Sequence, residues 1–154
     1  MNATVKSSPP KDWRTDEGTL VFAIGNSGRQ DDGLGWAFGE RLAASDDFQG
    51  TLAFRYQLQI EDADLLRTYH RVIFVDASKE DLPTGVAWSP LEAAGEVAFS
   101  THALSPGTVL RLAEELYDVR PEAWTLAIAG KEWELCIGLS EVAERHLELA
   151  WASI

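Results

Sequence analysis

The sequence predicts an α/β fold, a three-layer sandwich in which helices cover both faces of a mostly parallel sheet of about five strands. Two observations predict it. Apolar runs at residues 20–24, 72–75 and 124–129 lack the alternation of half-exposed strands, which is typical of strands buried on both faces of a parallel sheet. Segments with helical spacing of apolar residues lie between these runs, and alternating strands and helices are typical of this architecture.

The remaining strands are weaker in pattern. Residues 51–56 and 96–99 are expected to form strands at an edge of the sheet, and residues 86–88 have the composition to pair with a neighbour. The first helix is expected at about 33–45, because Leu34, Phe38 and Leu42 repeat at intervals of four. A short helix is expected at residues 61–69.

Capping residues predict the start of the last two helices. Ser105 followed by Pro106 supplies an N-cap and a proline at the first helical position, and the apolar face continues to about Tyr117. Ser140 opens the final helix. Its buried stripe is expected to consist of Ala143, Leu147, Ala150, Trp151 and Ile154.

The chain of 154 residues fits a single domain. Residues 1–17 carry mixed charges and no apolar period, so we expect a mobile leader there and one α/β domain over residues 18–154. The only cysteine, Cys136, excludes an internal disulfide and any zinc site with several cysteines. Because it lies in an apolar run, we expect it to be a small buried side chain.

The net charge of −12 argues against a nucleic-acid partner, which would require a basic face. It is compatible with binding a cation or a basic peptide, and equally with a solubilising surface. No apolar run is long enough to span a bilayer, and no secretory signal pattern is present. We therefore expect a cytoplasmic protein without a membrane partner.

Three chemically active residues follow strands. Asp32 comes a short loop after residues 20–24, Asp76 ends the second apolar run, and His102 follows residues 96–99. Since the carboxyl ends of parallel strands lie on one edge, all three side chains are expected to meet in one crevice if residues 96–99 run in the same direction as the other strands. Two carboxylates and an imidazole form a sensible divalent metal site, and they suit zinc, nickel, iron or manganese.

Each of these residues also has an ordinary explanation. Asp31 or Asp32 could cap the helix that starts near Gly33, with Asp31 the better candidate once Asp32 is assigned to the site. Asp76 could stabilise a turn, and a lone histidine such as His102 is often a hydrogen-bonded loop residue. Their joint placement, rather than any single residue, favours a site.

Known nucleotide and hydrolase motifs are absent from the sequence. There is no phosphate-binding loop and no dinucleotide fingerprint after the first strand. No nucleophile elbow of the Gly-x-Ser-x-Gly type occurs, so Ser27 is a weak candidate for a nucleophile. A nucleotide or small-molecule binder sharing only the fold is therefore disfavoured.

The residues resemble the hydrogenase maturation endopeptidases. The family's opening motif is similar to residues 24–35 of this chain, in which Ile24-Gly25-Asn26 is followed, after four residues, by the run from Asp31 to Gly35. Residues 71–77, 100–106 and 133–140 are similar to its strand ending in Asp-Ala, its histidine loop and the segment before its last helix. The resemblance spans about residues 19–150.

The resemblance implies a twisted, mostly parallel sheet and a proteolytic activity. Members remove a C-terminal peptide from the large-subunit precursor of a nickel–iron hydrogenase after nickel has been inserted. By position, Asp32, Asp76 and His102 match the metal-contacting residues, and Asp32 is also the candidate general base. The metal is expected to be nickel contributed by the substrate, or another divalent metal in the isolated protein; a monomer is favoured.

One departure from the family pattern leaves an alternative open. The family usually has Gly-x-Gly-Asn at the end of its first strand, whereas this chain has Ala23, whose methyl could narrow the approach of a ligand. The alternative is a non-catalytic nickel- or precursor-binding maturation chaperone on the same fold.

Overall fold

One sheet of five strands in the order β2-β1-β3-β5-β4 is the centre of the computed structural model, which describes residues 8–95 and 104–154. The strands are β1 (Thr19–Ile24), β2 (Thr51–Arg55), β3 (Arg71–Ser78), β4 (Val86–Pro90) and β5 (Glu122–Ala129). The helices are α1 (Leu34–Ala44), α2 (Glu61–Leu65), α3 (Pro106–Tyr117) and α4 (Glu141–Ala152). Three short 3-10 helices accompany them: η1 (Trp13–Thr15), η2 (Gln30–Gly33) and η3 (Leu66–Thr68). The predicted fold class is confirmed.

The three strongest strand predictions are confirmed as the centre of the sheet. β1 is buried along its whole length and pairs in parallel with β2 on one side and β3 on the other. β3 pairs in parallel with β5 from Arg71↔Glu122 to Ser78↔Ala129. The segment expected to pair is also confirmed, because β4 lies antiparallel to β5 at the edge. The predicted strand at residues 96–99 lies outside the described residues.

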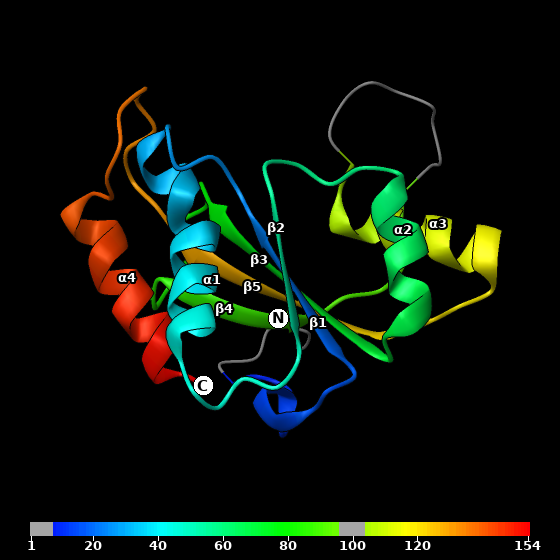
Figure 1. The fold of residues 1–154 in the computed structure, drawn as a ribbon. Helices are drawn as coiled ribbons and strands as arrows, with labels where there is room; N and C mark the ends of the chain where they lie inside the picture. Colours follow the sequence, from blue (N-terminus) through cyan, green and yellow to red (C-terminus); the bar gives the residue numbers. More distant parts are fainter. Residues whose placement is uncertain (1–7, 96–103) are drawn as a thin grey trace.

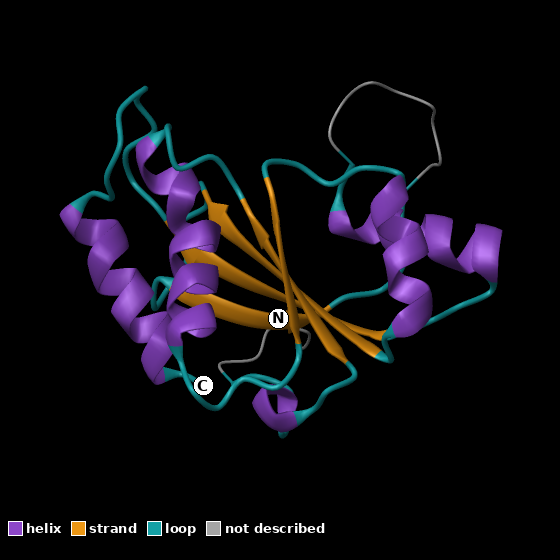
Figure 2. Cartoon of the chain, viewed as in Figure 1, coloured by secondary structure: helices purple, strands orange, loops and turns teal. Residues whose placement is uncertain are grey.

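Alternate side chains of the central strands enter two separate cores. Leu20, Phe22 and Phe74 pack toward α2 and α3. Val21 and Ile73 pack with Leu34, Phe38 and Leu42 of α1 and with Ala143 and Ala150 of α4. Figures 1 and 2 show the result, with α1 and α4 on one side of the sheet and α2 and α3 on the other. This alternation is what a parallel sheet covered on both faces requires.

Ala23 belongs to the core beneath α1. Its side chain is fully buried, and a Cβ placed on Gly39 of α1 would lie 2.6 Å from the Ala23 methyl. The helix can approach the strand closely because position 39 has no side chain. Since a strand alternates its side chains, the methyl points away from the face that carries Phe22 and Ile24.

Part of the predicted leader is packed against the domain. Trp13 is 2% exposed, and its ring lies 6.0 Å from the rings of both Phe48 and Trp88. Residues 8–17 therefore differ from the expectation of a mobile segment up to residue 17, because one large aromatic side chain attaches them to the α1–α4 core. Residues 1–7 lie outside the described residues.

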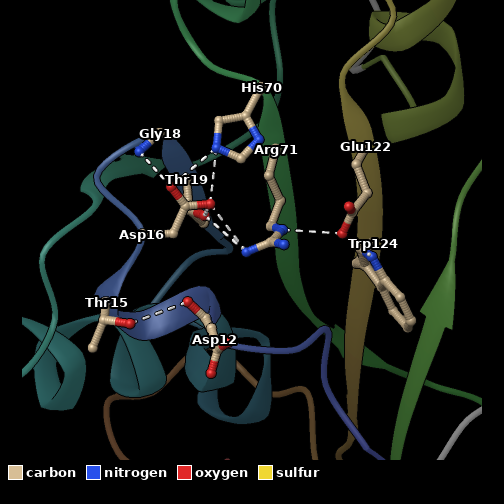
Figure 3. A network of polar contacts seen from close by, with 9 residues as sticks. All are labelled: Asp12, Thr15, Asp16, Gly18, Thr19, His70, Arg71, Glu122 and Trp124. Carbon is tan, nitrogen blue, oxygen red and sulfur yellow. Dashed lines mark hydrogen bonds and ion pairs between the residues drawn. The ribbon is translucent and has the colours of Figure 1, made fainter.

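A polar network attaches the same segment to the amino edge of the sheet, as Figure 3 shows. Asp16 accepts hydrogen bonds from Gly18 N–H at 2.9 Å and from Arg71 at 3.1 Å, and it lies 3.0 Å from a ring nitrogen of His70. Arg71 also donates to Glu122 of β5 at 3.0 Å. Partial burial by itself raises the pKa of Asp16, but its hydrogen bonds with Gly18, His70 and Thr19 together lower that pKa below the ordinary value. This network lies opposite the edge expected to hold a site.

Among residues 8–95 and 104–154, no helix combines the length and the apolar character needed to cross a bilayer.

We expect Asp16→Asn to reduce the free energy of unfolding at pH 7 by about 1 kcal/mol, because the neutral amide loses charge-assisted hydrogen bonds. A carboxylate with a lowered pKa stabilises the fold above its unfolded pKa, and this contribution is lost as the pH falls through the folded value. The difference between variant and wild type should therefore vanish once the pH lies below the lowered pKa of the folded state. Urea unfolding at several pH values measures it, with the exposed Asp46→Asn as control. A difference that persists in acid would contradict the ionic explanation.

Candidate functional site

A hollow of about 160 Å³ opens at the carboxyl edge of the sheet, between the ends of β1, β2 and β3. Its walls include the two carboxylates Asp32 and Asp76, which come from different strand–loop units. Gly25, Tyr56, Leu58 and Leu104 are further lining residues. The structure thus brings Asp32 and Asp76 to one crevice.

The loop after β1 is shaped so that Asp32 returns to the end of the strand. Gly25 has a φ of 142°, and a Cβ at this position would collide with the carbonyl oxygen of Asp32, so only glycine fits. The next residue, Asn26, donates its N–H to Asp32 Oδ2 at 2.9 Å. This hydrogen bond holds the carboxylate in one orientation beside the hollow.

Asp76 lies within β3, three residues after the buried Ile73 and one beyond the last pair between β1 and β3. Its Oδ1 accepts the N–H of Ala77 at 2.8 Å. Burial raises the pKa of Asp76 to about 7, the Ala77 hydrogen bond opposes this rise, and the nearby negative charge of Asp32 adds to it. The two carboxylates therefore repel each other across the hollow, and a bound cation would relieve that repulsion.

α1 begins close to the ends of β1 and β3 because Gly35 has no side chain that would hold the helix away from these strands. A Cβ on Gly35 would collide with the carbonyl oxygen of Ile24 and approach that of Val75 to 2.6 Å. The first turn of the helix consequently lies against β1 and β3. This close packing places Asp32, just before α1, at the sheet edge.

Asp31 is not the helix cap that the sequence suggested. The N-cap position of α1 is occupied by Gly33, without a side-chain hydrogen bond, and Asp31 is fully buried. Its carboxylate accepts hydrogen bonds from the N–H groups of Lys131 at 2.7 Å, Glu132 at 2.9 Å and Ser140 at 2.8 Å, and from Ser140 Oγ at 2.7 Å. Asp31 therefore fastens the β5–α4 loop to the turn that carries Asp32.

The hydrogen bonds also control the ionisation of Asp31. Burial raises the pKa of this carboxyl, but the donors from Glu132, Ser140 and Lys131 outweigh burial and lower the pKa below its ordinary value. Ser140 meanwhile caps α4 as predicted, because its Oγ accepts the N–H of Ala143 at 3.1 Å.

The third predicted site residue, His102, lies outside the described residues. Leu104 and Pro106, two and four positions after it in the sequence, both line the hollow. Ser105 caps α3 through the N–H of Thr108 at 3.1 Å, as predicted. In the described ranges, no group of three or more histidine, cysteine or acidic side chains is arranged to hold a metal. The predicted metal-binding trio therefore stays a prediction, of which the structure describes the positions of Asp32 and Asp76.

Two aromatic residues beside the hollow were not singled out from the sequence. Trp36 stacks on Tyr56 with ring centroids 5.2 Å apart and planes 15° apart, and its Nε1–H donates to the carbonyl of Arg55 at 2.9 Å. Trp36 is four residues beyond Asp32, a helical spacing that could have drawn attention to it. Tyr56 follows β2 at the same sheet edge as the two aspartates.

The expectation for Cys136 was wrong, since this cysteine is exposed. Its backbone carbonyl accepts the N–H of Gln30 at 2.9 Å, so the main chain rather than the side chain faces the protein. The apolar run around it resembles a buried strand, but it lies in a loop after β5 has ended at Ala129.

Solved structures with the same fold include several hydrogenase maturation proteases. The hydrogenase maturating endopeptidase HybD from E. coli matches with a TM-score of 0.68 and 21% identity, covering 87% of both chains. The [NiFe] hydrogenase maturation protease HycI from Thermococcus kodakarensis KOD1 matches with a TM-score of 0.63 and 25% identity, covering 88% of this chain and 89% of the other. The [NiFe] hydrogenase maturation protease HybD from Thermococcus kodakarensis matches with a TM-score of 0.57 and 24% identity, covering 86% of this chain and 93% of the other.

The chain therefore has the three-layer α/β fold of the hydrogenase maturation endopeptidases. No family model matches the sequence, and no curated protein matches it. Similarity is thus carried by the arrangement of the elements, which covers nearly the whole chain.

We expect Asp31→Asn to lower the free energy of unfolding by about 2–4 kcal/mol, because the amide NH₂ would face backbone donors in a buried place. The amides of residues 131–140 should also exchange faster with solvent than in the wild type. Hydrogen exchange and urea unfolding measure both effects. The matched control is Asp32→Asn, the same change at the neighbouring, half-buried carboxylate, which should lower the free energy of unfolding much less. Equal losses in the two variants would contradict the structural role assigned to Asp31.

For the metal-free protein, we expect stability to fall as the pH rises from about 4 to about 7 because of Asp76. The raised pKa means that the folded state holds this proton more tightly than the unfolded state, so ionisation weakens the fold. Asp76→Asn should remove this slope and be more stable than the wild type at pH 8, by about 1–4 kcal/mol. Urea unfolding from pH 5 to 8 tests this, with Asp46→Asn as control; an unchanged slope in Asp76→Asn would refute it.

Proposed function

We propose that the protein is an endopeptidase that removes the C-terminal peptide of a nickel–iron hydrogenase large-subunit precursor after nickel insertion. One observation carries this proposal: Asp32 and Asp76 share a crevice at the carboxyl edge of a sheet with the fold of hydrogenase maturation proteases. The neighbours' names supply the substrate class, and the two carboxylates supply a reason for metal recognition.

Nickel carried by the precursor would act as the recognition element. Carboxylate oxygens and an imidazole nitrogen are suitable ligands for such an ion. Asp32 and Asp76 provide the carboxylates, and we assign His102 as the imidazole because Leu104 lines the same hollow. A precursor without nickel would leave the repulsion between Asp32 and Asp76 uncompensated, so it would bind poorly and escape premature cleavage.

Asp32 is the residue that we assign to proton transfer. Its carboxylate is oriented by Asn26 N–H and lines the hollow, which suits a general base that accepts a proton from the attacking water. Water then adds to the scissile carbonyl carbon, the peptide C–N bond breaks, and the departing amine takes up the proton. We assign Asp76 to contacting the cation, because a bound positive charge would offset the burial and the negative charge of Asp32 that raise its pKa.

The alternative of a non-catalytic maturation chaperone depended on Ala23. The methyl of Ala23 is buried under Gly39 of α1, and Ala23 is not among the residues that line the hollow. The sequence departure is therefore accommodated inside the core and adds no side chain to the lining of the hollow. No described feature now favours the chaperone over the enzyme.

We expect the purified protein to release the C-terminal tail from nickel-loaded precursor and not from nickel-free precursor, as measured by mass spectrometry. Asp32→Ala, Asp76→Ala and His102→Ala should each reduce tail release by roughly 100-fold or more. Asp46→Ala is the matched control and should cleave normally. Equal cleavage of both precursor forms would overturn the nickel checkpoint, and normal cleavage by Asp32→Ala would overturn its role as base.

A further inference from the structure

The β5–α4 loop, residues 130–140, exposes large apolar side chains next to the candidate site. Leu135 is 76% exposed and Ile137 is 89% exposed, more than any other large apolar residue recorded for the described chain. In Figure 1 this loop, drawn in orange, rises beside the light-blue start of α1. Single exposed apolar residues are common, but two on one short loop at a candidate site need an explanation.

The loop is held in this exposed position by its backbone. Asp31 takes the N–H groups of Lys131, Glu132 and Ser140 at the two ends of the loop. Gln30 holds the middle, because its side-chain oxygen accepts the N–H of Glu134 at 2.9 Å and its own N–H donates to the Cys136 carbonyl at 2.9 Å. The apolar side chains are therefore presented on a fixed support, which lowers the entropy cost of binding a partner.

An apolar surface connects the loop with the catalytic crevice. A hollow of about 190 Å³ lies between α1 and the loop; its apolar lining consists of Trp36, Ala37, Ile137 and Leu139, and Ser27, Gln30 and Glu40 line it as well. Trp36 stacks on Tyr56, which is 67% exposed and lines the crevice of Asp32 and Asp76. Leu135, Ile137, Trp36 and Tyr56 are named the apolar platform below.

Charge also bears on the kind of partner. Glu40 lines the hollow, and Glu132 and Glu134 are exposed on the loop. The bases beside them are Lys131 on the loop and Lys79, whose ammonium group lies 5.1 Å from the centroid of the Trp133 ring. The whole chain carries a net charge of −12, and this overall charge favours an apolar segment with basic flanks as the partner.

We propose that the apolar platform binds the segment of the precursor next to the scissile bond, as an extended stretch with apolar side chains and basic flanks. The inference rests on the proposed function, because continuity with the crevice is what identifies the occupant as the cleaved chain. The platform would supply substrate affinity, whereas Asp32 and Asp76 supply metal recognition and chemistry.

The first test separates affinity from chemistry. Leu135→Ser/Ile137→Ser should raise KM for nickel-loaded precursor roughly tenfold or more with kcat little changed, because binding contacts and not reacting groups are removed. The control is Leu116→Ser, the same change at a 57% exposed leucine on α3, across the sheet, and it should leave KM unaltered. An unchanged KM in the double variant would overturn the proposal, as would an equal rise in the control.

The second test does not require cleavage. Cys136 is the only cysteine and lies between the two platform residues of the loop, so its alkylation by iodoacetamide reports on coverage of the platform. Nickel-loaded precursor should slow this alkylation. If the precursor protects Cys136 but no tail is released, the proposed protease function fails while the docking surface stands.

Two results would count against the docking surface itself. An unchanged alkylation rate in the presence of saturating precursor would overturn it whatever the cleavage result. The second result would come from analytical ultracentrifugation of the free protein. If the protein forms a dimer that protects Cys136 from alkylation, and if the Leu135→Ser/Ile137→Ser variant is a monomer, the platform is a contact between copies of this chain and the proposal is overturned.

Discussion

The buried carboxylate of Asp31 is the interaction on which the carboxyl edge of the sheet depends. An ionised group without contact with water is costly unless donors replace its solvation, and here three backbone N–H groups and one hydroxyl do so. These donors come from residues about a hundred positions later in the chain. One side chain thus fixes the turn after β1, the β5–α4 loop and the start of α4 relative to one another. Its neighbour Asp32 is thereby left to face the crevice.

Two aspartates at the same edge have been given opposite electrostatic environments. Both are buried, but the donors around Asp31 outweigh burial and lower its pKa, whereas burial raises the pKa of Asp76 because only one backbone donor opposes it and the charge of Asp32 adds to it. The protein itself therefore satisfies the first charge and leaves the second incompletely compensated. Ionisable groups whose charge the protein does not fully compensate are concentrated at binding and catalytic sites, because a bound ligand can supply the missing opposite charge. The proposed recognition of nickel uses this difference.

Most of the fold could be predicted from the sequence because its signals are local. Apolar runs located the central strands, and Ser105 and Ser140 located the starts of two helices. What could not be predicted depends on distant contacts. A helix-capping side chain binds an N–H group two or three residues later, and the position of Asp31 before a helical pattern suggested this role. The actual hydrogen-bond donors to Asp31 lie at residues 131–140, which no local pattern indicates. Trp13 showed no pattern in the sequence, because its contacts with Phe48 and Trp88 join distant segments. The apolar run at Cys136 likewise predicted a buried side chain, whereas the cysteine is exposed. Of the candidate site, Asp32 and Asp76 were placed together from topology, and His102 remains a prediction.

The contact between Ala23 and Gly39 shows how closely α1 lies on the sheet. A Cβ on Gly39 would lie 2.6 Å from the Ala23 methyl and 2.9 Å from the ring of Phe54, so two neighbouring strands leave no room for a side chain at this point of the helix. A glycine at position 23 would remove only the first of these two contacts. Position 39 is therefore restricted to glycine whether the strand carries alanine or glycine at position 23, and the departure at Ala23 needs no compensating change on the helix.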